Sequence, residues 1–149
     1  MDELWSAIAV DAAAESPLWG DALAPLHERQ LVRVFGDLAP EEYRLGLETI
    51  YEGYLLHFGR PRLFAPPDAD AALLLGDHLY AQGLVHIAAT GSVEAVAELA
   101  ELISTCAALQ ADGRPGDGEA WIATTRRLGG AAASAAVERA LAAHAARVG

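Results

Sequence analysis

The chain has 149 residues and a formal net charge of −11, from 21 acidic side chains against 10 basic ones. This length predicts one domain, and the acidic balance argues against binding to nucleic acid or to anionic membrane surfaces. All the basic residues are arginine, and the lack of lysine excludes Schiff-base chemistry and a lysine-containing phosphate loop. The single cysteine, Cys106, cannot form an internal disulfide, which favours a reducing, cytoplasmic location.

Composition favours an all-α fold. Alanine and leucine dominate, aromatic residues make up 7% of the chain, and β-branched residues do not run together. We expect about six helices joined by short loops, forming an antiparallel helical bundle in a single domain over 1–149. No secretory signal and no membrane-spanning segment are expected, because no sufficiently long uncharged apolar stretch occurs.

The first half of the chain is predicted to contain three helical segments, at 2–15, 18–38 and 40–58. The sequence Ser16-Pro17 ends the first of them. The second is read as one helix, or as two short ones around Pro25. Pro40 and the two glutamates after it favour a helix start, since proline suits the first turn and acids suit the positive end of the helix dipole. Three prolines make 59–67 a loop.

The second half is predicted to contain four helical segments. Asp68 and Ser92 are natural N-caps, so helices are expected to follow each of them, the first ending near Gly91 and the second covering 93–111. A glycine-rich turn over 112–118 then leads to helices at 119–128 and 131–148. The last helix is rich in alanine, and we expect the segment 131–149 to fray.

An unusual pair, Gly76-Asp77, lies in the middle of the helix predicted after Asp68. A glycine inside an exposed helix costs about 1 kcal/mol relative to alanine, which indicates close packing or a functional contact. An aspartate in such an apolar segment needs a hydrogen-bonding partner, and we expect Asp77 to be a structural residue in the core.

The pattern Leu-Leu-x-Gly-Asp-x-Leu-Tyr-Ala around this pair resembles the helix that follows the first aspartate-rich motif of trans-polyprenyl diphosphate synthases. Gly59-Arg60-Pro61 is similar to the Gly-x-Pro of that family, and Gly76 follows Gly59 by the family's 17 residues. Gly91-Ser92 falls at the next turn, and the resemblance extends over about 43–128. It implies a fold like half of an isoprenoid synthase, and it ends before the family's second aspartate-rich motif.

In this register the family's first aspartate-rich motif falls on 48–52. Glu48 and Glu52 replace its outer aspartates, and His57-Phe58 replaces an arginine pair. A competing register would align Leu55-Leu56-His57 with the residues before the aspartates, but it needs a gap to reach Gly76. The motif is incomplete in both registers, so the resemblance implies that the chain alone does not catalyse prenyl transfer.

The candidate site residues are Glu48, Glu52 and Asp77, as degenerate substrate-binding positions. Glu48 and Glu52 share a helix face; either they form a residual metal or polar site, or they lie on a solvated acidic face, which is the favoured interpretation. No catalytic residue, metal ligand or cofactor is assigned. The histidines lack metal-site spacing, and Cys106 is expected to be a small core residue. For Arg60 and Arg62, salt bridging or solvent exposure is expected rather than contact with an anion.

The functional hypothesis is a non-catalytic or regulatory subunit of a heteromeric polyprenyl diphosphate synthase, packing on a catalytic partner. The helix after Asp68 is its candidate interface, through Leu73, Leu74, Leu79 and Leu84. The alternative is a self-associating helical adaptor, or a small-ligand-binding protein, with a synthase-like scaffold and no role in prenyl transfer. An independent enzyme using Glu48, Glu52 and a histidine ranks last, because no nucleophile–base or metal spacing stands out.

Overall fold

The structure is a computed structural model and describes residues 2–148, within which the secondary structure is helical. Its α-helices are α1 (Glu3–Glu15), α2 (Pro17–Asp21), α3 (Arg44–Phe58), α4 (Ala69–Ala88), α5 (Val93–Ala111), α6 (Asp117–Arg127) and α7 (Ser134–Arg147). One isolated β-bridge joins Leu23 and Phe64, and no strand forms in the described part of the chain. The predicted all-α class is confirmed. No helix in the described range is long and apolar enough to cross a membrane.

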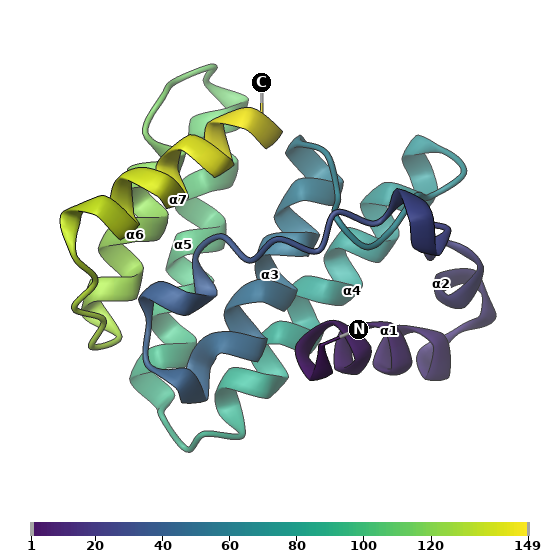
Figure 1. Ribbon diagram of the computed structural model, residues 1–149, viewed down its shortest axis with the longest axis horizontal. Helices are drawn as coiled ribbons and strands as arrows, with labels where there is room; N and C mark the ends of the chain where they lie inside the picture. The colour runs from purple at the N-terminus through teal and green to yellow at the C-terminus, as the bar shows by residue number, and fades with distance from the viewer. Residues whose placement is uncertain (1, 149) are drawn as a thin grey trace.

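Helix α3 is the centre of the fold. Figure 1 shows α3 and α4 side by side, with α1 and α2 to one side of them and α5, α6 and α7 to the other. Every residue from Gly46 to Leu56 is buried, so all faces of this helix are covered. One hydrophobic cluster joins α3 to α5, α6 and α7, and a second lies among α1, α4 and the loop before α4. A residue on α3 is therefore placed between two cores.

Glycines allow α3 and α4 to pack closely. They are spaced seven residues apart on both helices, and the helices run antiparallel, so that Gly53 faces Gly76 and Gly46 faces Gly83. A Cβ at Gly53 would lie 2.8 Å from the carbonyl oxygen of Gly76, a distance that real side chains do not tolerate. The close-packing interpretation of Gly76 is therefore confirmed.

The prediction for Asp77 is wrong. Gly76 faces α3, and the next residue along the helix consequently points to solvent, with the Asp77 side chain 71% exposed. Its carboxylate lies 3.1 Å from Nε2 of His57 and is not buried in the core. The interface prediction for α4 is also wrong in part, because Leu79 is buried in the core while Leu73 and Leu74 are exposed.

The segment predicted as helix over 18–38 is largely irregular. Helix α2 ends at Asp21, and only two short 3-10 turns follow, at Leu26–Glu28 and Gly36–Leu38. The backbone N–H groups of Val34 and Gly36 donate to a side chain of α3 instead of to helix carbonyls. Figure 1 shows this segment crossing α3 as a loop.

The remaining boundaries follow the predictions closely. The side chains of Asp68 and Ser92 accept hydrogen bonds from Ala71 N and Ala95 N, so both predicted N-caps are confirmed. A 3-10 turn, Glu41–Tyr43, precedes α3. Helix α6 begins two residues earlier than predicted, after Gly116 with its left-handed φ of 117°, and α7 begins three residues later, at Ser134.

Candidate functional site

Glu48 and Glu52, the two glutamates predicted as candidate site residues, form a buried cluster with Arg62. The side chains of Glu48, Glu52 and Arg62 are all 0% exposed. Arg62 Nη1 donates to Glu48 Oε1 at 2.5 Å, and Arg62 Nε donates to Glu52 Oε1 at 3.0 Å. One guanidinium therefore bridges both carboxylates, which lie one turn apart on α3.

Backbone N–H groups satisfy the other carboxylate oxygens. Glu48 Oε2 accepts from Val34 N at 3.0 Å and from Gly36 N at 2.7 Å. Glu52 Oε2 accepts from Arg62 N at 2.9 Å and from Leu63 N at 2.8 Å. All four carboxylate oxygens thus accept at least one hydrogen bond. These donors compensate a cluster whose formal charge is one negative unit in excess.

Glycine at position 36 is a requirement of this arrangement. A Cβ there would lie 2.7 Å from Cγ of Glu48 and 2.8 Å from Glu48 Oε2. Any larger residue would separate the loop backbone from the carboxylate that it binds. The loop that was predicted to be helical is therefore held in place by its contact with α3.

Aromatic rings enclose the guanidinium of Arg62. Its Cζ lies 4.6 Å from the ring centre of Trp5 and 4.9 Å from that of Tyr51, within the range of cation–π attraction. Burial opposes the charge on Arg62, but Glu48 and Glu52 outweigh it and hold the pKa of the guanidinium above its usual value. The cluster therefore links α1, α3 and the loop before α4 through one cation.

The expectation of a solvated acidic face for Glu48 and Glu52 is wrong. Arg62 and the loop around Val34 cover that face of α3, and the carboxylates have no open coordination position. Magnesium needs hard oxygen ligands in a near-octahedral arrangement with room for water or phosphate. As arranged, the Glu48–Glu52–Arg62 cluster acts as a structural unit. The salt-bridging interpretation of Arg62 is confirmed.

A second polar network, which the sequence reasoning missed, connects α3, α5, α6 and α7. The Tyr51 hydroxyl lies 2.8 Å from His144 Nδ1, and His144 Nε2 lies 2.8 Å from Asp117 Oδ2. Tyr54 Oη donates to the same Asp117 oxygen at 2.7 Å and accepts from Gln110 Nε2 at 2.9 Å. A neutral His144 with its proton on Nε2 satisfies every one of these bonds. No spacing signal could have found the network, because Asp117 and His144 are 27 residues apart.

The hydrogen bond from His144 lowers the pKa of Asp117 to about 2, against the opposing effect of burial and with help from Tyr54. Burial raises the pKa of Tyr51 and Tyr54, so both stay protonated. An open pocket of about 480 Å³ lies beside this network, between the start of α6 and the end of α7, with Asp117 and His144 in its wall.

No nucleophile accompanies the Asp117–His144 pair. Cys106 is buried as predicted, its Sγ lies 3.9 Å from the backbone carbonyl oxygen of Asp117, and burial raises the pKa of the thiol to about 12. A thiol held neutral in this way is inert. The hydrogen bonds of the network join α3, α5, α6 and α7.

Three of the histidines each contact a different partner. His57 pairs with Asp77, His86 lies 3.3 Å from Asp11, and His78 stacks on Trp19 with ring centres 6.1 Å apart. Over residues 2–148, no three His, Cys, Asp or Glu side chains converge in a way that could hold a metal ion. Comparison with protein-family models, with curated proteins and with solved structures finds no match for this chain.

Proposed function

We propose that this chain is a non-catalytic subunit of a heteromeric polyprenyl diphosphate synthase, where it packs against a catalytic partner. The observation that carries the proposal is the state of the degenerate motif. On the register defined by Gly59 and Gly76, Glu48 and Glu52 occupy the metal-binding positions of the family, and both carboxylates bind Arg62 instead. A subunit in this state would contribute surface to the complex rather than chemistry.

An exposed apolar strip supports the packing role. On α4, Leu74 is 60% exposed and Val85 is 59% exposed, and Val93 at the start of α5 is 82% exposed. Positions 74, 81, 85 and 88 fall on one face of α4, and all four are exposed. We call the residues Leu74, Val85 and Val93 the α4–α5 strip; Leu73 is also exposed but lies about 100° away around α4. Exposed aliphatic side chains grouped in this way are typical of a helix-packing interface.

The test is co-expression with the catalytic polyprenyl synthase of the same organism, followed by affinity purification and product analysis. The proposal expects a stable complex whose product chain length differs from that of the catalytic subunit alone. Leu74→Asp combined with Val85→Asp should abolish the complex, because two charges would be buried in an apolar contact. The matched control is Val10→Asp, at a 65% exposed position on α1 outside the strip. A chain that never co-purifies with the synthase and leaves its products unchanged would overturn the proposal.

The same strip also favours one alternative, a self-associating helical adaptor without a role in prenyl transfer. Light scattering after gel filtration separates the two functions. A stable homodimer that the two aspartate substitutions dissociate, together with no effect on any prenyl synthase, would establish the alternative.

A further inference from the structure

Arginines line a groove between α7 and the loop that covers the buried cluster. Two adjoining pockets, of about 360 Å³ and 220 Å³, lie between α7 and the loop at 30–38, and Val32 and Ala143 belong to both. Four of the chain's ten arginines line them: Arg33, Arg60, Arg139 and Arg147. We call the two pockets together the arginine groove. In a chain of net charge −11, such a concentration of cations is unexpected.

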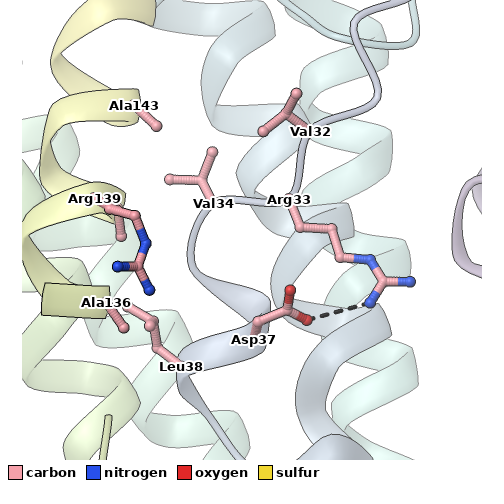
Figure 2. Close-up of a pocket in the computed structure, with 9 residues that line it drawn as sticks. Val32, Arg33, Val34, Asp37, Leu38, Ala136, Arg139 and Ala143 are labelled. Atoms are coloured by element: carbon pink, nitrogen blue, oxygen red, sulfur yellow. Dashed lines mark hydrogen bonds and ion pairs between the residues drawn. The ribbon is translucent and has the colours of Figure 1, made fainter. Parts of the chain in front are cut away.

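Most of these cations lack an acidic partner. Asp37 is the one acidic residue in the lining, and it pairs with Arg33 and Arg44. Figure 2 shows Arg33 pointing away from the pocket toward Asp37, whereas Arg139 extends from α7 toward it. Among the described residues, no carboxylate forms an ion pair with Arg60, Arg139 or Arg147. The lining of the groove therefore carries four positive charges against one negative charge.

Arg60 and Arg147 both line the smaller pocket. Arg147 Nη1 donates to the carbonyl oxygen of Arg60 at 3.2 Å, and Arg147 Nη2 donates to Gln30 Oε1 at 2.9 Å. Burial lowers the pKa of Arg147, and the nearby charges of Arg62 and Arg60 lower it further. An anion placed between Arg60 and Arg147 would relieve this repulsion and accept charge-assisted hydrogen bonds.

The larger pocket is walled mainly by aliphatic side chains. One face of α7 contributes Ala136, Ala140 and Ala143, and the loop contributes Val32, Val34 and Leu38. Val32, where the two pockets meet, is 55% exposed. Arg139 and Arg147 are eight residues apart on α7, which separates their Cα atoms by about 12 Å. An apolar group could therefore run along this wall from an anion bound at Arg60 and Arg147.

We propose that the arginine groove binds a soluble anionic amphiphile, a phosphate or carboxylate carrying one short alkyl-type chain. The headgroup lies between Arg60 and Arg147, and the chain lies over Val32 into the pocket beneath Arg139. The larger pocket falls within the range of small-molecule sites, which is roughly 300–1,000 Å³. The net charge of −11 opposes docking to an anionic bilayer, so the occupant is a free molecule. The inference does not depend on the proposed subunit role, because the α4–α5 strip lies on other elements.

The probe is octyl phosphate, titrated calorimetrically as a monomer into the full chain. We expect saturable one-to-one binding of octyl phosphate. Inorganic phosphate lacks the alkyl chain and 1-octanol lacks the anionic headgroup, so each should bind at least about tenfold more weakly. Arg60→Gln should weaken binding about tenfold, since the Arg60 side chain is exposed and its loss should not disturb the fold. Val32→Asp should weaken it at least as much by placing a charge in the path of the chain.

Arg126→Gln is the matched control, at an exposed position on α6 outside both pockets, and it should leave the affinity unchanged. Circular dichroism checks that each variant is folded. Equal binding of octyl phosphate to Val32→Asp and the parent chain would overturn the proposal, as would equal affinities for octyl and inorganic phosphate. Binding to phosphatidylglycerol vesicles without binding to monomeric octyl phosphate would show a bilayer site and would also overturn it.

Discussion

Replacing Arg62 with methionine should be among the most damaging substitutions in this chain. Methionine keeps the apolar part of the side chain about as far as the position of Nε, and it removes the charge, its donors and the volume of the guanidinium. Two fully buried carboxylates would then lose their common cation. Removing one partner of a buried pair costs about 3–5 kcal/mol. The Arg62 donors to the carbonyls of Val32 and Glu48 would also be lost, at about 1 kcal/mol each.

The expected loss is therefore about 5–7 kcal/mol, which is comparable with the whole stability of a small domain at about 5–15 kcal/mol. The assay is urea denaturation followed by circular dichroism at pH 7 and at pH 5. Arg60→Met is the matched control, because Arg60 is exposed and two residues away, and it should cost less than about 0.5 kcal/mol. The loss of stability in Arg62→Lys should lie between those of Arg62→Met and Arg60→Met, because lysine keeps the charge but cannot bridge two carboxylates with a planar guanidinium.

Comparing the stability at pH 7 with that at pH 5 distinguishes the loss of the Arg62 charge from a simple loss of packing. In Arg62→Met an uncompensated carboxylate favours proton uptake in the folded state more than in the unfolded chain. A group that binds its proton more tightly in the folded state gives stability that is present at low pH and lost as pH rises. The deficit relative to the parent chain should therefore shrink between pH 7 and pH 5. A deficit below about 1 kcal/mol, or one that does not change with pH, would refute the assignment of Glu48 and Glu52 as a charged cluster held by Arg62.

Three further perturbations probe the helix packing, the second network and metal binding. Gly53→Ala should cost about 1–2 kcal/mol in urea denaturation, since its Cβ would lie 2.8 Å from a carbonyl oxygen of α4, whereas Gly20→Ala, with 3.4 Å to its nearest neighbour, should be close to neutral. The lowered pKa of Asp117, about 2, gives stability that is present above pH 4 and lost as pH falls toward 2. After solvent screening this amounts to about 1 kcal/mol, and Asp117→Asn should remove that part of the acid sensitivity, measured as the difference in unfolding free energy between pH 6 and pH 3. Magnesium at about 10 mM should not raise the Tm above that in sodium chloride of matched ionic strength, because Glu48 and Glu52 have no free oxygen; a rise of several degrees would contradict the closed geometry.

Local signals explain which parts of the fold the sequence could predict. The N-caps Asp68 and Ser92 act within three residues of themselves, and the helices that follow them begin where expected. The helix prediction for 18–38 failed because the backbone N–H groups of Val34 and Gly36 donate to the side chain of Glu48. This residue lies 12 to 14 positions farther along the chain. Propensity and periodicity describe neighbours in sequence, and this loop is determined by a contact with a distant residue.

Local sequence signals also could not predict which side chains form the Glu48–Glu52–Arg62 cluster. Arg60 and Arg62 flank Pro61 symmetrically in the sequence, yet Arg62 is fully buried while Arg60 is exposed. Nothing in the local sequence distinguishes them. The difference comes from the position of the two glutamates across the fold, together with the rings of Trp5 and Tyr51 that enclose only one of the two arginines.

The geometry around α3 shows how the chain itself supplies the positive charge that two buried carboxylates require. A carboxylate pair one turn apart on a central helix needs a positive counterpart, whether a divalent cation or a side chain. Arg62 supplies that charge from within the chain, and four backbone N–H groups provide the remaining hydrogen bonds. Such a site cannot exchange its cation for substrate without unfolding the loops that cover it. The two proposed binding functions lie outside this cluster, and the α4–α5 strip and the arginine groove use different elements. Leu74→Asp with Val85→Asp should therefore leave octyl phosphate binding intact, and Val32→Asp should leave the synthase complex intact, so the two proposals can fail separately.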